Sequence, residues 1–377
     1  MKIVFVSNYF NHHQAPITYE FDKQTNHNFY FIETIPMEQE RKNLGWGNES
    51  KPDYVLQSYL DADSMESAQQ LILNADVVIW GSCPFEMISP RLKMKKLTFA
   101  YSERIFKSGN FISKLLRAVK YNFKLRRYQD NHYLLCASGY AAEDYNKIGL
   151  FKDKSFKWGY FPETKIYENI DELISSKEKK SILWVARFID WKHPEIAVNL
   201  AKYLKTKGYE FTLNMIGTGP LENDIKANIE NNNLSDCVHA LGSMSPEKVR
   251  EHMEKSEIFI FTSDRNEGWG AVLNEAMNSA CATVSNKDIG AVPYLIDNSN
   301  NGFKYNGNDF EELYSIVESL LNDHDKRCSV GRKAYSYISD RWNAKTAVSN
   351  FLLIINRITI GNVEGKKNFL YDPCTNA

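Results

Sequence analysis

The fold of this chain is decided by one stretch, Ile258-Phe-Ile-Phe-Thr-Ser263-Asp264-Arg-Asn-Glu267-Gly-Trp-Gly-Ala-Val-Leu-Asn-Glu275-Ala-Met277. Its apolar run predicts a buried strand, the polar residues predict a loop, and the two glycines precede a predicted helix. We expect Glu267 at the end of the strand and Glu275 about two turns into the helix. Free N–H groups at a helix start favour a phosphate, and a nearby carboxylate can bind a sugar diol. The stretch is a candidate site for a nucleotide sugar, although a loop carboxylate and a solvated helix face would look the same.

Similar strand–helix units repeat along the whole chain, which predicts an α/β protein with parallel, doubly wound sheets. The predicted strands are 2–7, 28–33, 76–81, 97–102, 132–138, 181–187, 211–217, 238–242, 258–263 and 282–286. Predicted helices include 194–205, 246–255 and a final long helix, 344–360.

A domain boundary is predicted near 157–162, where the sequence becomes aromatic and turn-like before a polar stretch that ends at 177–180. We expect two Rossmann-like domains, 1–163 together with 344–377, and 164–343. Their parallel sheets should face a cleft, with ligand at the carboxyl ends of the strands.

Composition narrows the classes of function. The formal net charge of -1 gives no reason to expect a nucleic acid as partner. The six cysteines show neither C-x-x-C nor a His/Cys metal-ligand spacing, so we predict reduced structural thiols and no metal site. No long signal-peptide core follows the first residues, and no apolar run approaches the ~20 residues that span a bilayer. A cytoplasmic protein is predicted.

Two further turns bear on which ligand the protein binds. In Trp184-Val-Ala-Arg187-Phe-Ile-Asp-Trp-Lys192-His-Pro194, two cations lie between a strand and a helix, where they can neutralise a diphosphate. Surface ion pairs are the alternative.

The turn Gly217-Thr-Gly219-Pro220 lacks the third glycine of the dinucleotide fingerprint, and the segment after the first strand has no glycine. NAD binding is therefore not expected.

Taken in order, these elements resemble a retaining family 4 glycosyltransferase of the GT-B fold. The resemblance covers about 181–321, and the N-terminal half matches only in its alternation of strands and helices. It rests on the Arg187/Lys192 turn, Gly217-Thr-Gly219-Pro220, Val238-His-Ala-Leu-Gly242, the E-x7-E element from Glu267 to Glu275, Ala282-Thr-Val-Ser285, Gly290-Ala-Val-Pro-Tyr-Leu-Ile296 and Asn301-Gly302.

The resemblance implies a transferase that uses a nucleotide diphosphate sugar, most often UDP-linked, without a divalent metal or other cofactor. Arg187 and Lys192 would bind the diphosphate, Glu275 would hold the ribose, and Glu267 would face the sugar as part of the catalytic set. The final helix would cross back to the N-terminal domain, which would bind the acceptor. The donor-binding residues implied are Gly217, Gly219, Gly242, Ser243, Met244, Gly268, Trp269, Gly270, Ala271, Val272 and Glu275.

The N-terminal half departs from the family. Members commonly carry a glycine pair after the first strand and a histidine after a central strand. This chain has Asn11, His12 and His13 at the first place and Glu103-Arg104 at the second. All five are candidates for the acceptor side of the site. An exposed histidine pair and a helix-start ion pair are the competing interpretations.

The segment 104–127 contains eight cations, no acid, and apolar residues at helical spacing. A basic amphipathic helix favours an anionic membrane surface, which would attach the protein to the inner face of the cell membrane. A helix packed on the sheet with a solvated basic face is the alternative.

The predicted function is transfer of a sugar to an acceptor hydroxyl of a glycan or lipid-linked saccharide, in cell-surface polysaccharide synthesis. A GT-B-type epimerase or phosphorylase, and a non-catalytic sugar-nucleotide-binding subunit, stay open. A glycosidase would need Glu267 and Glu275 about 5–10 Å apart, on either side of one bond.

Overall fold

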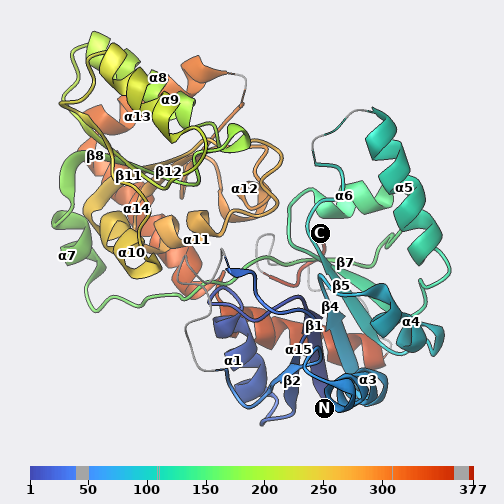
Figure 1. Cartoon of the computed structure of the whole chain (residues 1–377). Coiled ribbons are helices and arrows are strands. Elements are labelled where there is room, and N and C mark those ends of the chain that lie inside the picture. The colour runs from blue at the N-terminus through green and yellow to red at the C-terminus, as the bar shows by residue number, and fades with distance from the viewer. Residues whose placement is uncertain (40–50, 108, 110, 308, 361–372) are drawn as a thin grey trace. The chain divides into compact units, whose positions relative to one another are not determined.

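A computed structural model describes residues 1–39, 51–107, 109, 111–307, 309–360 and 373–377. The chain forms two compact units (Figure 1). Unit 1 consists of Met1–Glu163 and Trp342–Ala377, and unit 2 consists of Thr164–Arg341. Each unit is built on its own parallel sheet.

The sheet of unit 1 has the strand order β3-β2-β1-β4-β5-β6-β7. Every residue of β1 (Ile3–Ser7) is buried, as expected for a parallel strand with helices on both faces. The other strands are β2 (Phe29–Glu33), β3 (Val55–Gln57), β4 (Val77–Trp80), β5 (Thr98–Ser102), β6 (His132–Cys136) and β7 (Ser155–Lys157). The helices include α1 (Ala15–Gln24), α3 (Ala62–Asn74), α4 (Phe85–Lys93), α5 (Phe111–Leu125) and α6 (Ala141–Asn146).

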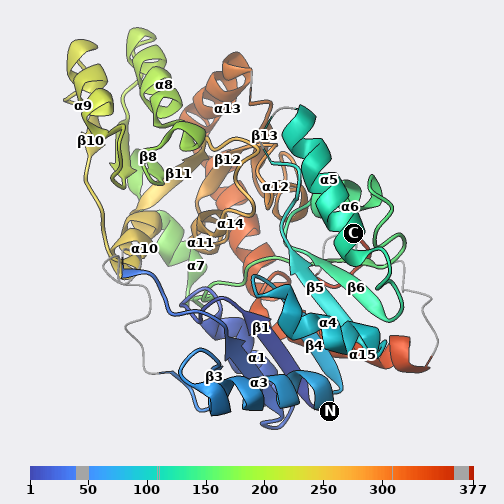
Figure 2. The same ribbon diagram turned by 45° about the vertical axis from the view of Figure 1, so that its right-hand side comes forward.

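The final helix, α15 (Ala344–Ile360), has the predicted bounds and belongs to unit 1, where it lies beside α1 (Figure 1 and Figure 2). Phe351 on this helix is fully buried, and its ring contacts those of Phe21, Phe99 and Trp158. These aromatic contacts hold the last helix on the core of unit 1. The predicted return of this helix to the N-terminal domain is therefore confirmed.

The sheet of unit 2 has the order β10-β9-β8-β11-β12-β13. Its strands are β8 (Glu178–Val185), β9 (Thr212–Ile216), β10 (Val238–Ala240), β11 (Ser256–Phe261), β12 (Ala282–Asn286) and β13 (Phe303–Tyr305). Its helices are α7 (Ile170–Ser175), α8 (Pro194–Thr206), α9 (Glu222–Asn231), α10 (Pro246–Lys255), α11 (Ala271–Asn278), α12 (Val292–Leu295), α13 (Phe310–Asn322) and α14 (His324–Asp340), with a 3-10 turn, η1, at Asp190–Lys192.

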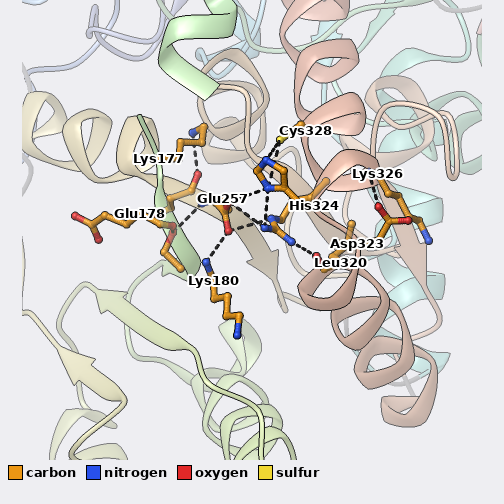
Figure 3. Close-up of polar contacts among 12 residues, drawn as sticks. Lys177, Glu178, Lys180, Glu257, Leu320, Asp323, His324, Lys326 and Cys328 are labelled. Carbon is orange, nitrogen blue, oxygen red and sulfur yellow. Dashed lines mark hydrogen bonds and ion pairs between the residues drawn. The ribbon is translucent and has the colours of Figure 1, made fainter. Parts of the chain in front are cut away.

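Of the polar stretch 177–180, expected before the second sheet, Lys177 precedes β8 and residues 178–180 begin it. Lys177 is buried, and its Nζ donates to the carbonyl oxygens of Ser256 (2.8 Å) and Ser279 (2.8 Å), among others. Glu257 accepts the backbone N–H of Lys180 at 2.6 Å (Figure 3). Buried charges persist where hydrogen bonds satisfy them. These polar residues therefore join β8 and β11 at the amino ends of the strands, opposite to the candidate site.

Candidate functional site

Two glycine turns, at 217–219 and at 242, pack with the loop after β8 at the carboxyl ends of β8, β9 and β10. Gly217 has φ +140°, and a Cβ there would overlap the carbonyl oxygen of Ala186. A Cβ on Gly219 would lie 2.5 Å from the carbonyl oxygen of Phe188. The Gly217 N–H donates to the carbonyl of Gly242 at 2.8 Å. Only glycine permits this approach, so the predicted glycines are brought together with the loop that carries Arg187.

Lys192 and Glu267 form an ion pair at the same end of the sheet. Their side chains are only 13% and 11% exposed. Burial lowers the pKa of Lys192, Glu267 opposes this effect, and the charge of Arg187 adds to it. Arg187 itself is exposed. The structure thus places two cations and one carboxylate of the predicted set within electrostatic reach.

Backbone contacts fix the two loops that carry this pair. The N–H of Asp264 donates to the carbonyl of Trp191 at 3.0 Å. Thr262 Oγ1 donates to the carbonyl of Lys192 at 2.7 Å and accepts from Trp184 Nε1 at 2.8 Å. The pair is therefore held by the fold and does not depend on flexible surface side chains.

Glu267 and Glu275 differ in position from the prediction. Strand β11 ends at Phe261, so Glu267 lies in the following loop and not at the strand end. Helix α11 begins at Ala271, so Glu275 lies about one turn into the helix and not two. Burial raises the pKa of Glu275, and Arg250 opposes that shift. The two glutamates thus face different cations.

Gly270 opens α11 with φ +94°, and a Cβ there would lie 2.6 Å from the ring of Phe261. Trp269, predicted among the donor-binding residues, is buried together with Asn274, and the Trp269 Nε1 donates to the Asn274 Oδ1 at 2.9 Å. These two side chains stabilise the start of α11. The backbone N–H groups of this turn, and not the two side chains, are therefore the groups that can contact a ligand. The other predicted donor residues are distributed as follows: Gly268 is buried, Ala271, Val272 and Met244 are partly buried, and Ser243 is exposed after β10.

A cavity of about 550 Å³ lies within unit 1, at the carboxyl ends of β1, β4 and β5. Of the five residues predicted for the acceptor side, Asn11, His13, Glu103 and Arg104 line it; the ring of His12 contacts that of His13, with ring centroids 3.9 Å apart and the planes tilted by 47°. The cavity wall also contains Ser82, Cys83, Tyr101, Lys107, Lys124 and Tyr160.

Hydrogen bonds organise the polar wall of this cavity. Glu103 accepts from the Tyr160 hydroxyl at 2.8 Å and from the Lys107 Nζ at 2.6 Å. Arg104 lies over the ring of Tyr140 at 4.5 Å. Tyr160 and Lys107 were not predicted as site residues. Their position after β7 and β5 was the available signal, because ligands bind at the carboxyl ends of parallel strands.

Helix α5 lies at the periphery of unit 1, beside α6 (Figure 1 and Figure 2). Phe111 and Phe123 are 81% and 84% exposed, and Ile112, Leu115, Leu116 and Val119 are exposed as well. The alternative of a helix that packs its apolar face on the sheet is therefore wrong. The face with Tyr121, Lys124 and Leu125 lines the cavity. Within the described part of the chain, no helix is long and apolar enough to cross a membrane.

Comparison with known proteins shows which family the second unit resembles. Residues 166–337 match the model of the glycosyl transferases group 1. The matched residues lie within unit 2, which is therefore similar to the domain of this family. This confirms the predicted resemblance for the segment that carries the glycine turns and the Lys192–Glu267 pair.

The chain is similar to glycosyltransferases of bacterial polysaccharide synthesis. The chain is 28% identical to the amylovoran biosynthesis glycosyltransferase AmsK of Erwinia amylovora over 182 residues, which are 47% of this chain and 44% of AmsK. It is 27% identical to the putative colanic acid biosynthesis glycosyltransferase WcaL of Salmonella typhimurium over 165 residues, 42% of this chain and 40% of WcaL. The chain thus spans less than half the length of these relatives.

Among solved structures, Anabaena HepE in complex with UDP and glucose is similar with a TM-score of 0.68 and 14% identity, over 94% of this chain and 99% of HepE. With two parallel sheets and a final helix returned to unit 1, the fold is GT-B, as predicted.

Proposed function

We propose that the protein is a retaining glycosyltransferase that moves a sugar from a nucleotide diphosphate sugar, UDP-linked, to an acceptor hydroxyl. The observation that carries this proposal is the buried Lys192–Glu267 pair, with Arg187 nearby, beside two glycine turns. The HepE structure with UDP and glucose supports the choice of donor, and the similarity to AmsK and WcaL supports a role in polysaccharide synthesis.

The proposed chemistry is electrostatic. As the bond from the sugar to the diphosphate breaks, negative charge develops on the leaving phosphate oxygen. Arg187 and Lys192 stabilise that charge, and so do the free N–H groups at the start of α11. The acceptor hydroxyl attacks from the face that the diphosphate leaves, and its proton passes to the leaving oxygen. The configuration of the sugar is thereby retained.

No divalent metal is needed in this proposal, because Arg187 and Lys192 supply the positive charge. The buried position of Lys192 makes its charge effective, since electrostatic interactions strengthen away from water. In the unliganded protein Glu267 balances Lys192, and the donor diphosphate would compete for this cation. Transfer should therefore persist in the presence of a chelator.

The cavity of unit 1 is proposed to bind the acceptor. Tyr101 and Tyr160 offer aromatic surface, with ring centroids 6.2 Å apart, and Glu103 offers a carboxylate that can accept from sugar hydroxyls. A few oriented polar groups among aromatic side chains are typical of ligand pockets. A saccharide, free or linked to a lipid, is the proposed acceptor.

Helix α5 is proposed to dock on an anionic membrane surface. Its exposed apolar side chains would enter the lipid, while Lys120, Arg126 and Arg127, which are exposed, would meet acidic headgroups. Because α5 also lines the cavity, docking would bring the acceptor site to a lipid-linked saccharide at the membrane.

A donor screen tests the proposed function. Purified protein is melted with a panel of nucleotide sugars, free nucleotides and inorganic phosphate. A ligand at 100 times its Kd adds about 2.7 kcal/mol of stability, so one nucleotide sugar should raise the melting temperature clearly. Stabilisation by none of them would contradict the proposal. Product analysis with that donor then distinguishes transfer from epimerisation without acceptor and from phosphorolysis.

A further inference from the structure

His193 occupies an unusual backbone position between η1 and α8. Its φ and ψ are +52° and +56°, in the left-handed region that glycine adopts freely and side chains with a Cβ disfavour. Strained residues of this kind persist where the surrounding structure holds them. Here the ring itself provides such contacts.

The imidazole of His193 lies between two carboxylates. Its Nδ1 is 2.8 Å from Glu195 Oε1, and its Nε2 is 3.5 Å from Asp264 Oδ2. A neutral imidazole has one N–H and could donate to only one of them, whereas the imidazolium donates to both. The hydrogen bond with Glu195 raises the pKa of His193, Asp264 adds to the shift, and partial burial opposes it.

The two carboxylates belong to different elements of unit 2. Glu195 lies in the first turn of α8, and Asp264 lies in the loop after β11. The carbonyl of Asp264 accepts the N–H of Glu267 at 3.0 Å, and the charge of Asp264 also acts on Lys192. The ring therefore joins the loop that carries Lys192 to the loop that carries Glu267.

We propose that His193, in its imidazolium form, is a positioning residue that clamps these two loops together and thereby sets the affinity for the donor diphosphate. This inference rests on the proposed function. Because the folded state raises the pKa of His193, the clamp is complete below the unfolded value of 6.5 and is lost as pH rises through the folded value. Donor binding should weaken over that interval.

The test compares His193→Asn with the wild type, because asparagine tolerates the left-handed region but carries no charge. His27→Asn is the matched control: His27 also has a left-handed φ of +59° and contacts one carboxylate, Asp22, at 2.7 Å, but it lies in unit 1. We measure the ring titration by NMR, melting temperature from pH 6 to 9, and UDP affinity over the same range.

We expect the His193 signal to titrate above pH 6.5, and the Kd for UDP to rise several-fold through that titration. The His193→Asn variant should bind UDP weakly, with a Kd that does not depend on pH. The variant should be less stable to heat than the wild type only at pH values below the folded pKa of His193. His27→Asn should follow the wild type. A ring that titrates at or below 6.5, or a variant with the wild-type pH profile, would overturn the clamp. If no nucleotide binds at any pH, the proposed function fails, while titration and melting still report on the clamp itself.

Discussion

Lys192 and Glu267 are 75 positions apart in sequence and form a buried ion pair at the carboxyl end of the unit 2 sheet. Each comes from a loop that follows a buried strand, and a backbone hydrogen bond from Asp264 to Trp191 joins those loops. In the unliganded site, the buried Lys192 ammonium is therefore neutralised by the Glu267 carboxylate. A diphosphate can take the place of that counter-charge, which links the fold to the proposed transfer.

Substitution of Glu267 should show, through the change in stability, whether the Lys192–Glu267 pair is buried. Glu267→Gln leaves the Lys192 ammonium unpaired and is expected to lower the free energy of unfolding of unit 2 by about 3 kcal/mol. The double variant Lys192→Met/Glu267→Gln should recover much of that loss. Denaturation followed by a probe in unit 2 measures both. Equal stability of Glu267→Gln and the wild type would contradict a buried pair.

The turn at Gly217 should tolerate no side chain. Gly217→Ala must displace the backbone of Ala186, whereas Gly208→Ala, with φ +79° and no atom within 4 Å of its Cβ, has only backbone strain. We expect Gly208→Ala to cost about 1 kcal/mol and Gly217→Ala about 1–3 kcal/mol more. Melting temperatures of the two variants, with nucleotide affinity, test this. Similar losses in both would mean that the turns are not packed as described.

Glu275 should oppose stability and favour binding. Burial raises its pKa, so its stabilising contribution is present below its unfolded pKa and is lost as pH rises through the folded value. At pH 7, Glu275→Gln should therefore raise the melting temperature. It should also weaken UDP binding about tenfold, as expected for loss of a charged hydrogen bond of about 1.5 kcal/mol. Glu230→Gln on the exposed face of α9 is the control. Unchanged affinity would remove Glu275 from the donor site.

The exposed face of α5 should govern binding to lipid. Leu116→Ser/Phe123→Ser is expected to reduce sedimentation with anionic vesicles at least tenfold, because two large apolar side chains no longer enter the lipid. Leu353→Ser removes a similarly exposed side chain from α15 and should bind as the wild type does. Binding to neutral vesicles should be weak, and salt should reduce binding to anionic ones. Failure of the wild-type protein to sediment with anionic vesicles would contradict membrane docking.

Much of the fold is predictable from local sequence. Helices α10 and α15 and strand β12 have the predicted bounds, since each combines a regular apolar period with clear end signals. Of the three-residue strands, β10 lies within the predicted range 238–242, whereas β3, β7 and β13 were not predicted, because so short a run gives little periodic signal. Lys177 shows another limit: a buried lysine satisfied by distant carbonyls resembles a surface residue in the sequence.

The site is predictable to different degrees in the two units. In unit 2 the motifs are compact, and the turns that carry Gly217 and Lys192 lie together as expected from adjacent strands. In unit 1 the cavity is assembled from single residues after several strands, such as Lys107 and Tyr160, which no local motif marks. Periodicity predicts the apolar stripe of α5 but does not determine whether another element covers it.

The central claim is that Arg187 and Lys192 stabilise the leaving diphosphate, and turnover of their alanine variants tests it most directly. With the donor found by the screen and a saccharide acceptor, Arg187→Ala and Lys192→Ala should each lower kcat roughly 10²–10³-fold. Lys205→Ala, which removes an exposed ion pair with Asp236 in the same unit, should keep the wild-type rate. Near-normal turnover of both variants would contradict the account.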